Sequence, residues 1–195
     1  MADTFRDVFK LPDLKRRILF TLGMLFVFRL GAHIPTPGID SAAMSQLFEG
    51  SGVLGFLDLF AGGALRRFSL FSLGVAPYIN ASIVLQLAAV IFPTLERIQK
   101  EGPQGQKKMT QYTRFGAIFF AFVQAFGMAM WLRRAGVLGA SGLDFAVAVI
   151  TAVAGSVAVM WIGEEMTDHG IGNGISMLIF AGIVARLPEA VVQTL

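Results

Sequence analysis

Long stretches without charged residues recur along the chain and dominate its pattern. The longest covers residues 68–95, and three shorter ones cover 115–132, 145–163 and 170–185. A transmembrane helix needs roughly 20 consecutive, predominantly apolar residues. The four stretches therefore predict membrane-spanning helices, and we expect the last of them to continue past Arg186.

A fifth apolar run, at residues 18–28, follows three basic residues, as in a signal peptide. Acidic residues dilute that basic region, however, Arg29 interrupts the run, and no small-x-small cleavage site follows. An uncleaved span of about 18–34 fits better, with Arg29 near its far end, where it can snorkel to the interface or face the protein interior. The expected membrane domain, residues 18–195, thus has spans at about 18–34, 70–93, 112–132, 146–165 and 171–192.

Residues 1–17 precede this domain and predict a cytoplasmic amphipathic segment. Phe5, Val8 and Phe9 share one helical face, charged residues occupy the opposite face, and Pro12 ends the helix. A helix of this kind lies in the interface of the cytoplasmic leaflet. A frayed soluble tail is the alternative.

Composition supports a membrane protein. Hydrophobic residues make up 55% of the chain and charged residues 15%, whereas soluble domains are about 25% charged. A soluble domain of this length has too little interior to bury that much apolar surface. The expected fold class is an all-α membrane protein with five transmembrane helices.

The positions of Lys and Arg predict a cytoplasmic N-terminus, because basic flanks of spans stay inside. With that orientation, ten basic residues lie inside and five outside, and the C-terminus lies outside. The inside residues are Arg6, Lys10, Lys15, Arg16, Arg17, Arg97, Lys100, Lys107, Lys108 and Arg114. The outside residues are Arg66, Arg67, Arg133, Arg134 and Arg186.

Catalytic chemistry has little support in the sequence. The chain has no cysteine and two histidines, and neither a Ser–His–Asp set nor a histidine pair with metal-ligand spacing is visible. The dense polar cluster at residues 164–169 is interpreted as a solvated turn. We therefore expect no catalytic residue, metal or cofactor, and a protein that is not an enzyme.

The glycine-rich run at residues 170–174 is not a dinucleotide fingerprint, because it lacks the final glycine and no strand precedes it. Gly170 and Gly174 have the spacing that allows helices to approach closely.

The segment at residues 55–67 is apolar but too short to cross a bilayer. Gly62 and Gly63 weaken any helix there by roughly 1 kcal/mol each. The segment is either re-entrant and movable or an ordinary external loop helix, and its spacing does not choose between them.

The expected span at 70–93 contains polar residues near its middle. Pro77 is expected to bend this helix, and polar groups such as Asn80, Ser82 and Gln86 usually face a protein interior or a wet cavity at that depth.

Aliphatic pairs at i, i+4 occur in two of the expected spans. Val75 and Ile79 share a helical face, and so do Ile175 and Ile179. Such side chains form either a hydrophobic constriction or plain packing and lipid-facing surfaces.

Residues 96–110 are polar and predict a mobile cytoplasmic loop, which either docks a negatively charged partner or is only solvated.

Residues 73–82, Leu-Gly-Val-Ala-Pro-Tyr-Ile-Asn-Ala-Ser, resemble the signature of the second span of SecY, the central subunit of the bacterial protein-conducting channel. Further SecY-like stretches follow the family's order over nearly the whole chain, at residues 28–31, 34–40, 62–65, 100–102, 111–114, 170–176 and 179–185.

The resemblance implies a channel that passes unfolded polypeptides across the cytoplasmic membrane and releases hydrophobic segments sideways into lipid. The aliphatic pore ring of the family matches Val75, Ile79, Ile175 and Ile179, and one wall of its lateral gate matches Asn80, Ser82, Gln86 and Gln124. The plug that seals the closed pore matches Leu57, Asp58, Leu59, Phe60, Ala61, Gly62, Gly63, Ala64, Leu65, Arg66 and Arg67.

The resemblance also implies partners. These are SecE and SecG-like small subunits, the motor ATPase SecA or a ribosome, secretory and membrane protein chains with signal sequences, and the lipid of the bacterial cytoplasmic membrane. Family members have ten spans in two halves of inverted topology, and this chain resembles the N-terminal half. We therefore expect the C-terminal half of the same protein as a partner, and expect the 195 residues alone not to form a closed pore.

A small-molecule or ion transporter subunit is the alternative function. It predicts buried charges within the spans, and beyond Arg29 the expected spans hold almost none.

Overall fold

The computed structural model describes residues 12–49 and 63–194, which form helices joined by turns and contain no strand beyond two isolated bridges. The helices are α2 (Pro12–Gly31), α3 (Ser41–Glu49), α5 (Ala76–Ile91), α6 (Pro93–Lys100), α7 (Pro103–Arg134), α8 (Gly142–His169) and α9 (Gly174–Thr194). The all-α class is therefore confirmed for the described part. Most of the expected amphipathic segment at 1–17 lies outside the described residues.

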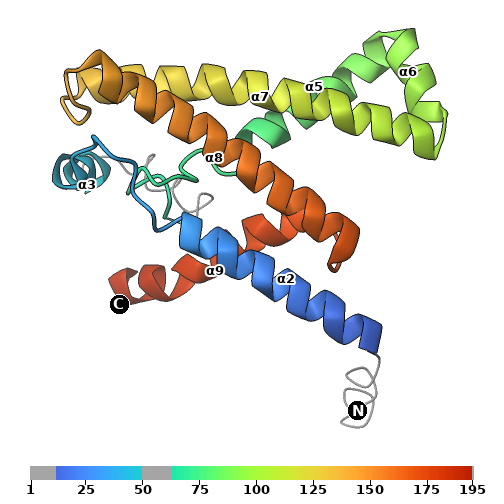
Figure 1. The fold of residues 1–195 in the computed structure, drawn as a ribbon, viewed down its shortest axis with the longest axis horizontal. Helices are drawn as coiled ribbons and strands as arrows, with labels where there is room; N and C mark the ends of the chain where they lie inside the picture. The colour runs from blue at the N-terminus through green and yellow to red at the C-terminus, as the bar shows by residue number, and fades with distance from the viewer. Residues whose placement is uncertain (1–11, 50–62, 195) are drawn as a thin grey trace.

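The two longest helices, α7 and α8, run antiparallel and form the frame of the molecule (Figure 1). A stripe of buried alanines at every fourth position of α7 faces this packing: Ala117, Ala121, Ala125 and Ala129. Small side chains let two helix backbones approach closely. The outer face of α7 instead presents large apolar residues such as Phe115 and Phe119, as suits a surface in contact with lipid.

Within the described residues, α7 and α8 are long and apolar enough to cross a membrane, and α5 with α6 makes a third if that bent pair is one span. α2 occupies most of the expected first span, and α9 occupies the expected fifth. The expected count of five spans, and their bounds, stay predictions.

The helix α5 begins at Ala76, several residues after the start of the expected span. Pro77 lies in its first turn, where a missing N–H leaves no hydrogen bond unmade. The expected bend at Pro77 is therefore wrong, because this proline starts the helix. The residues before it form turns, in which Gly74 has a positive φ of 54°.

The break between α5 and α6 lies at Phe92. Pro93 disfavours a helical conformation at the residue before it, and Phe92 accordingly has φ −101° and ψ 111°. The two helices meet there at a bend of 106°. The expected loop at 96–110 is also wrong, since α6 and the first turns of α7 fill that range and join at Gly102, which has φ +72°.

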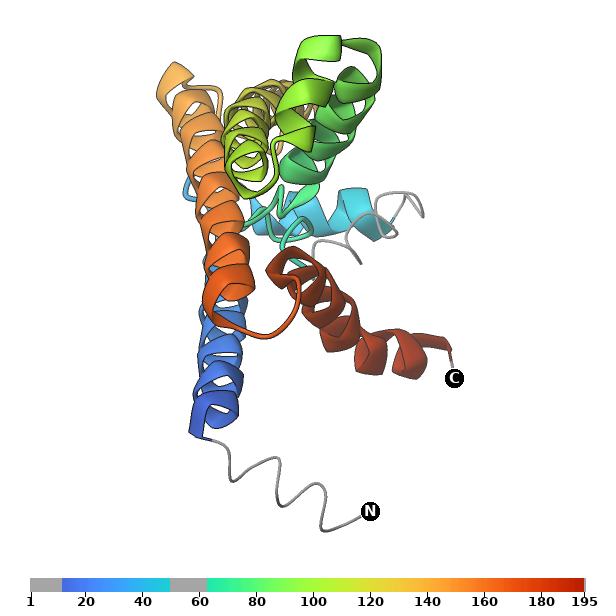
Figure 2. The ribbon, with the colours of Figure 1, turned by 90° about the vertical axis from the view of Figure 1, so that its right-hand side faces the viewer.

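A second packing group joins α2, α8 and α9. Phe28 of α2 stacks on Phe71 with ring centroids 5.8 Å apart, and Val159, Ile162 and Leu178 complete the cluster with Met166. Figure 2 shows α9 turning away from the end of α8 on the side where α5 lies. This placement leaves α5 and α9 facing each other without close packing.

Candidate pore-lining cleft

A cleft of about 570 Å³ lies between α5 and α9, with α7 and α8 closing its sides. Its lining residues come from four helices and from the turn before α9. They are Tyr78, Ile79, Ser82, Ile83, Gln86, Thr110, Arg114, Glu164, Thr167, Asp168, Asn173, Ile175, Ser176 and Ile179.

The lining includes a group of branched aliphatic side chains from two helices that are distant in sequence. Ile79 and Ile83 belong to α5, and Ile175 and Ile179 belong to α9. Ile79 and Ile179 are half-buried, whereas Ile175 is buried and packs over Gly163, where an added Cβ would lie 2.6 Å from its Cδ1 atom. The structure thus brings three of the four expected ring residues to one cleft.

Val75, the fourth expected ring residue, does not line the cleft. It is the N-cap residue of α5, is half-buried, and packs against the cluster that contains Phe28 and Phe71. It lies one residue before the helix because α5 starts at Ala76.

The expected gate residues divide into two groups. Ser82 and Gln86 line the cleft, and the Gln86 side-chain amide donates a hydrogen bond of 3.0 Å to the Ser82 hydroxyl. Asn80 is exposed on α5 and Gln124 is half-buried on α7, and neither lines the cleft.

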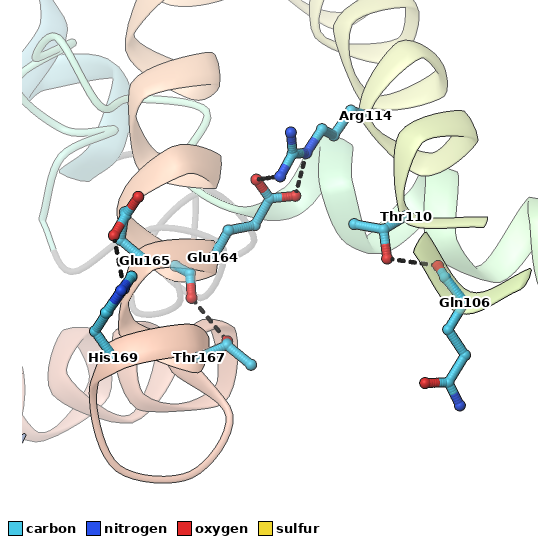
Figure 3. A network of polar contacts seen from close by, with 8 residues as sticks. Gln106, Thr110, Arg114, Glu164, Glu165, Thr167 and His169 are labelled. Atoms are coloured by element: carbon cyan, nitrogen blue, oxygen red, sulfur yellow. Dashed lines mark hydrogen bonds and ion pairs between the residues drawn. The ribbon is translucent and has the colours of Figure 1, made fainter. Parts of the chain in front are cut away.

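An ion pair crosses from α7 to α8 at the polar side of the cleft (Figure 3). The Arg114 guanidinium contacts both carboxylate oxygens of Glu164 at 2.7 Å, so the pair is bidentate. The Glu164 side chain is only 13% exposed. The interpretation of residues 164–169 as a solvated turn is therefore wrong at Glu164, because these residues form the last turns of α8 and Glu164 faces α7.

Sequence patterns alone do not predict this pair. They assign Arg114 only to the basic flank of a span, and the two residues are 50 positions apart. One feature of the sequence could have indicated the pair. A basic and an acidic residue lie at the adjacent ends of two consecutive antiparallel spans.

The start of α9 is held close to the end of α8. The Gly174 N–H donates to the Thr167 hydroxyl at 2.9 Å, and the Ser176 N–H donates to the Asn173 side chain at 3.1 Å. An added Cβ at Gly174 would overlap the carbonyl oxygen of Gly163. The expected close approach at Gly174 is therefore confirmed, and it places Ile175 against α8.

The expected plug is only partly described. Residues 57–62 lie outside the described residues, and residues 63–67 form turns. Ala64 and Leu65 are buried, and Leu65 belongs to a core cluster with Met44 of α3 and Leu132 of α7.

In the part of the chain that the structure describes, no group of three or more His, Asp or Glu side chains is arranged to hold a metal ion.

Two solved structures have a similar fold. "Sec61 in the Canine ribosome-channel complex from the endoplasmic reticulum" and "The structure of a protein conducting channel" each match with a TM-score of 0.65. The match covers 88% of this chain and 36% of theirs, at 20% sequence identity. The described part of the chain therefore shares the helical fold of these two structures.

Sequence relatives define the family. The SecY family model matches residues 69–195. "Protein translocase subunit SecY" of Pseudomonas aeruginosa is 49% identical over 188 residues, which cover 94% of this chain and 42% of that protein. The subunit of the same name from Thermotoga maritima is 43% identical, with 99% and 48% covered. The chain belongs to the SecY family and spans about half the length of these relatives.

Proposed function

We propose that this chain forms one half of the wall of a protein-conducting channel. The channel moves unfolded polypeptides across the cytoplasmic membrane and releases hydrophobic segments sideways into lipid. The single observation that supports this most directly is the cleft between α5 and α9, in which Ile79, Ile175 and Ile179 come together.

The chemistry of the cleft suits such a channel. Branched aliphatic side chains contact a passing chain without a hydrogen bond or charge to select one sequence, and an empty narrow apolar constriction loses its water and resists ion flow. Its polar residues, among them Ser82 and Asn173, give the cleft a wettable side. The channel itself performs no covalent chemistry.

The rest of the pore belongs to partners. The C-terminal half of the same protein completes the ring, and α5 and α7, with Asn80, Ser82, Gln86 and Gln124, form one wall of a lateral gate. Residues 57–67 act as the plug. SecE and SecG-like subunits bind the channel, and SecA or a ribosome drives the secretory chain through it. Support comes from relatives named as protein translocase subunits and from a solved structure named as a ribosome-channel complex.

Site-specific crosslinking tests the proposal. A photoreactive residue at position 79 or 179 of the natural protein, in its membrane, should form adducts with a secretory chain stalled during export. Position 150 is the matched control, because Ile150 is an isoleucine of α8 that is 66% exposed and does not line the cleft. Adducts at 150 alone, or at none of the three positions, would contradict the proposal.

The transporter alternative is less well supported. The relatives are named protein translocase subunits. Among the described residues, the charged groups of the cleft are the Arg114–Glu164 ion pair and Asp168, on its polar side.

A further inference from the structure

The turn between α8 and α9, residues 170–173, is attached to α2, which lies about 150 positions earlier in the chain. This contact belongs neither to the cleft nor to the expected ring, plug or gate. The turn leads from the end of α8 into the start of α9 (Figure 2).

Thr21 of α2 makes the central contact. Its side chain is 4% exposed, and its hydroxyl takes part in two hydrogen bonds. The hydroxyl donates to the Arg17 carbonyl within α2 at 2.9 Å and accepts the Ile171 backbone N–H at 3.2 Å. The first bond holds the hydroxyl in the direction that the second bond needs.

Arg17 adds a second bond to the same turn. Its guanidinium donates to the Gly170 carbonyl at 3.2 Å, at the C-terminal end of α8 where backbone carbonyls lack helical partners. The fit around Gly170 is tight, because an added Cβ would lie 2.7 Å from the Thr21 hydroxyl oxygen.

The neighbouring ends of α8 and α9 add a third restraint. Gly174 touches the backbone of Gly163, and its N–H is bound by Thr167. The turn is thus bound by α2 through Ile171 and by α8 through Gly174. Few backbone torsions remain free between Ile171 and Gly174. The two attachments therefore set the direction of α9.

We propose that Thr21, assisted by Arg17, is a positioning residue that sets the direction of α9 and so the separation of Ile179 from Ile79 across the cleft. The importance of that separation for transport rests on the proposed function. The claim that Thr21 sets the direction of α9 does not rest on the proposed function. The distance between α5 and α9 that tests it is measured without any transported chain.

The test compares Thr21→Val, which removes both hydrogen bonds at nearly constant volume, with Thr21→Ser, which keeps the hydroxyl. Thr113→Val is the matched control. Thr113 is also a buried threonine, and its hydroxyl donates to the carbonyl four residues earlier at 2.9 Å, within its own helix α7.

The readout is the distance between spin labels on α5 and α9, in the natural protein with its subunits in bilayers. Cysteines at Leu87 and Phe180 accept the labels, since both side chains are exposed and neither lines the cleft. None of the 195 residues is a cysteine. Hydrogen exchange of the Ile171 amide reports the bond itself.

Thr21→Val is expected to shift or broaden the label distance and to speed Ile171 exchange by about fivefold, as the loss of one hydrogen bond predicts. Thr21→Ser and Thr113→Val should match the unmodified protein in both measurements. If Thr21→Val does not fold, Arg17→Gln replaces it, because Arg17 is exposed, and it should shift or broaden the label distance relative to the unmodified protein.

Faster exchange of Ile171 with an unchanged label distance would overturn the proposal, since the bond would then exist without orienting α9. A shift in Thr113→Val equal to that in Thr21→Val would also overturn it. Failure of the crosslinking experiment leaves these distances unaffected, so the two proposals fail separately.

Discussion

Arg114 and Glu164 join α7 to α8 through two contacts of 2.7 Å across 50 positions of sequence. The Glu164 carboxylate is mostly shielded from solvent, with 13% of the side chain exposed, whereas the Arg114 side chain is 48% exposed. The pair therefore differs from an ordinary surface ion pair in geometry and burial, and it lies beside the cleft.

A double-mutant cycle measures how strongly this pair joins the two helices. Glu164→Gln and Arg114→Gln, singly and together, should show a coupling free energy of about 1–2 kcal/mol in unfolding, because the pair is bidentate and half-shielded. The control cycle uses Glu96 and Lys100 of α6, an exposed i, i+4 pair, which should couple by only about 0.3–0.5 kcal/mol. Equal coupling free energies in the two cycles would show that shielding of Glu164 by the helices does not strengthen its pairing with Arg114.

Gly155 of α8 is expected to tolerate no side chain. An added Cβ would overlap the Leu70 carbonyl oxygen, and the neighbouring Ser156 hydroxyl donates to the Gly74 carbonyl at 3.2 Å, so the turn before α5 rests directly on α8. Gly155→Ala should lower the free energy of unfolding by about 1–3 kcal/mol, as overpacking does.

The control for Gly155 is Gly127→Ala in α7, where an added Cβ meets nothing within 4 Å. There the substitution should raise stability by about 0.5–1 kcal/mol, because alanine is the better helix former. Equal effects at the two glycines, measured by denaturant unfolding in mixed micelles, would mean that the turn does not rest on α8.

The aliphatic residues of the cleft are expected to limit ion leakage, a prediction that depends on the proposed function. Serine at positions 79 and 179 of the natural protein should increase ion flux through empty channels in proteoliposomes, because a polar constriction stays wet. Ile150→Ser changes the same residue type on the exposed face of α8 and should leave flux unchanged. Equal ion flux in all variants would show that Ile79 and Ile179 do not form the constriction.

The cytoplasmic N-terminus is expected to place the α6–α7 junction inside and the α7–α8 turn outside. A membrane-impermeant maleimide should label Lys107→Cys only from the cytoplasmic side and Ala135→Cys only from the outer side. Both positions are exposed, so lack of labelling reports the membrane and not burial. The opposite pattern would reverse the orientation that the basic flanks predict.

The sequence predicted the type and approximate position of a helix wherever the charge spacing and hydrophobicity of that one segment were sufficient. Uncharged runs predicted α7, α8 and α9 because the spacing of charges is local and lipid admits apolar side chains on the outside of a helix. The close approach at Gly174 was expected from its spacing to Gly170. The contact exists, but Gly170 ends α8 and Gly174 begins α9, so the two glycines do not share one helix face.

The start of α5 was decided by contacts that no local pattern contains. Residues 68–75 are as apolar as the helix that follows, yet the Phe68 carbonyl accepts the Thr36 N–H at 3.1 Å, and the Leu70 N–H donates to the Ile34 carbonyl at 2.9 Å. These bonds with the chain after α2 compete with helical bonds, so Pro77 lies in the first turn of α5 and not inside a span that begins near residue 70. Val75 thereby ends outside the cleft.

Composition, uncharged runs and motifs predict a helical membrane protein of the SecY family. They also name five of the residues that line its cleft, Ile79, Ser82, Gln86, Ile175 and Ile179. Only the tertiary structure decided that Ile79 and Ile179 share that cleft, that Arg114 meets Glu164, and that Thr21 binds the turn before α9. The physical reason is that helical periodicity assigns a residue to a face, whereas packing between helices distant in sequence decides what that face meets.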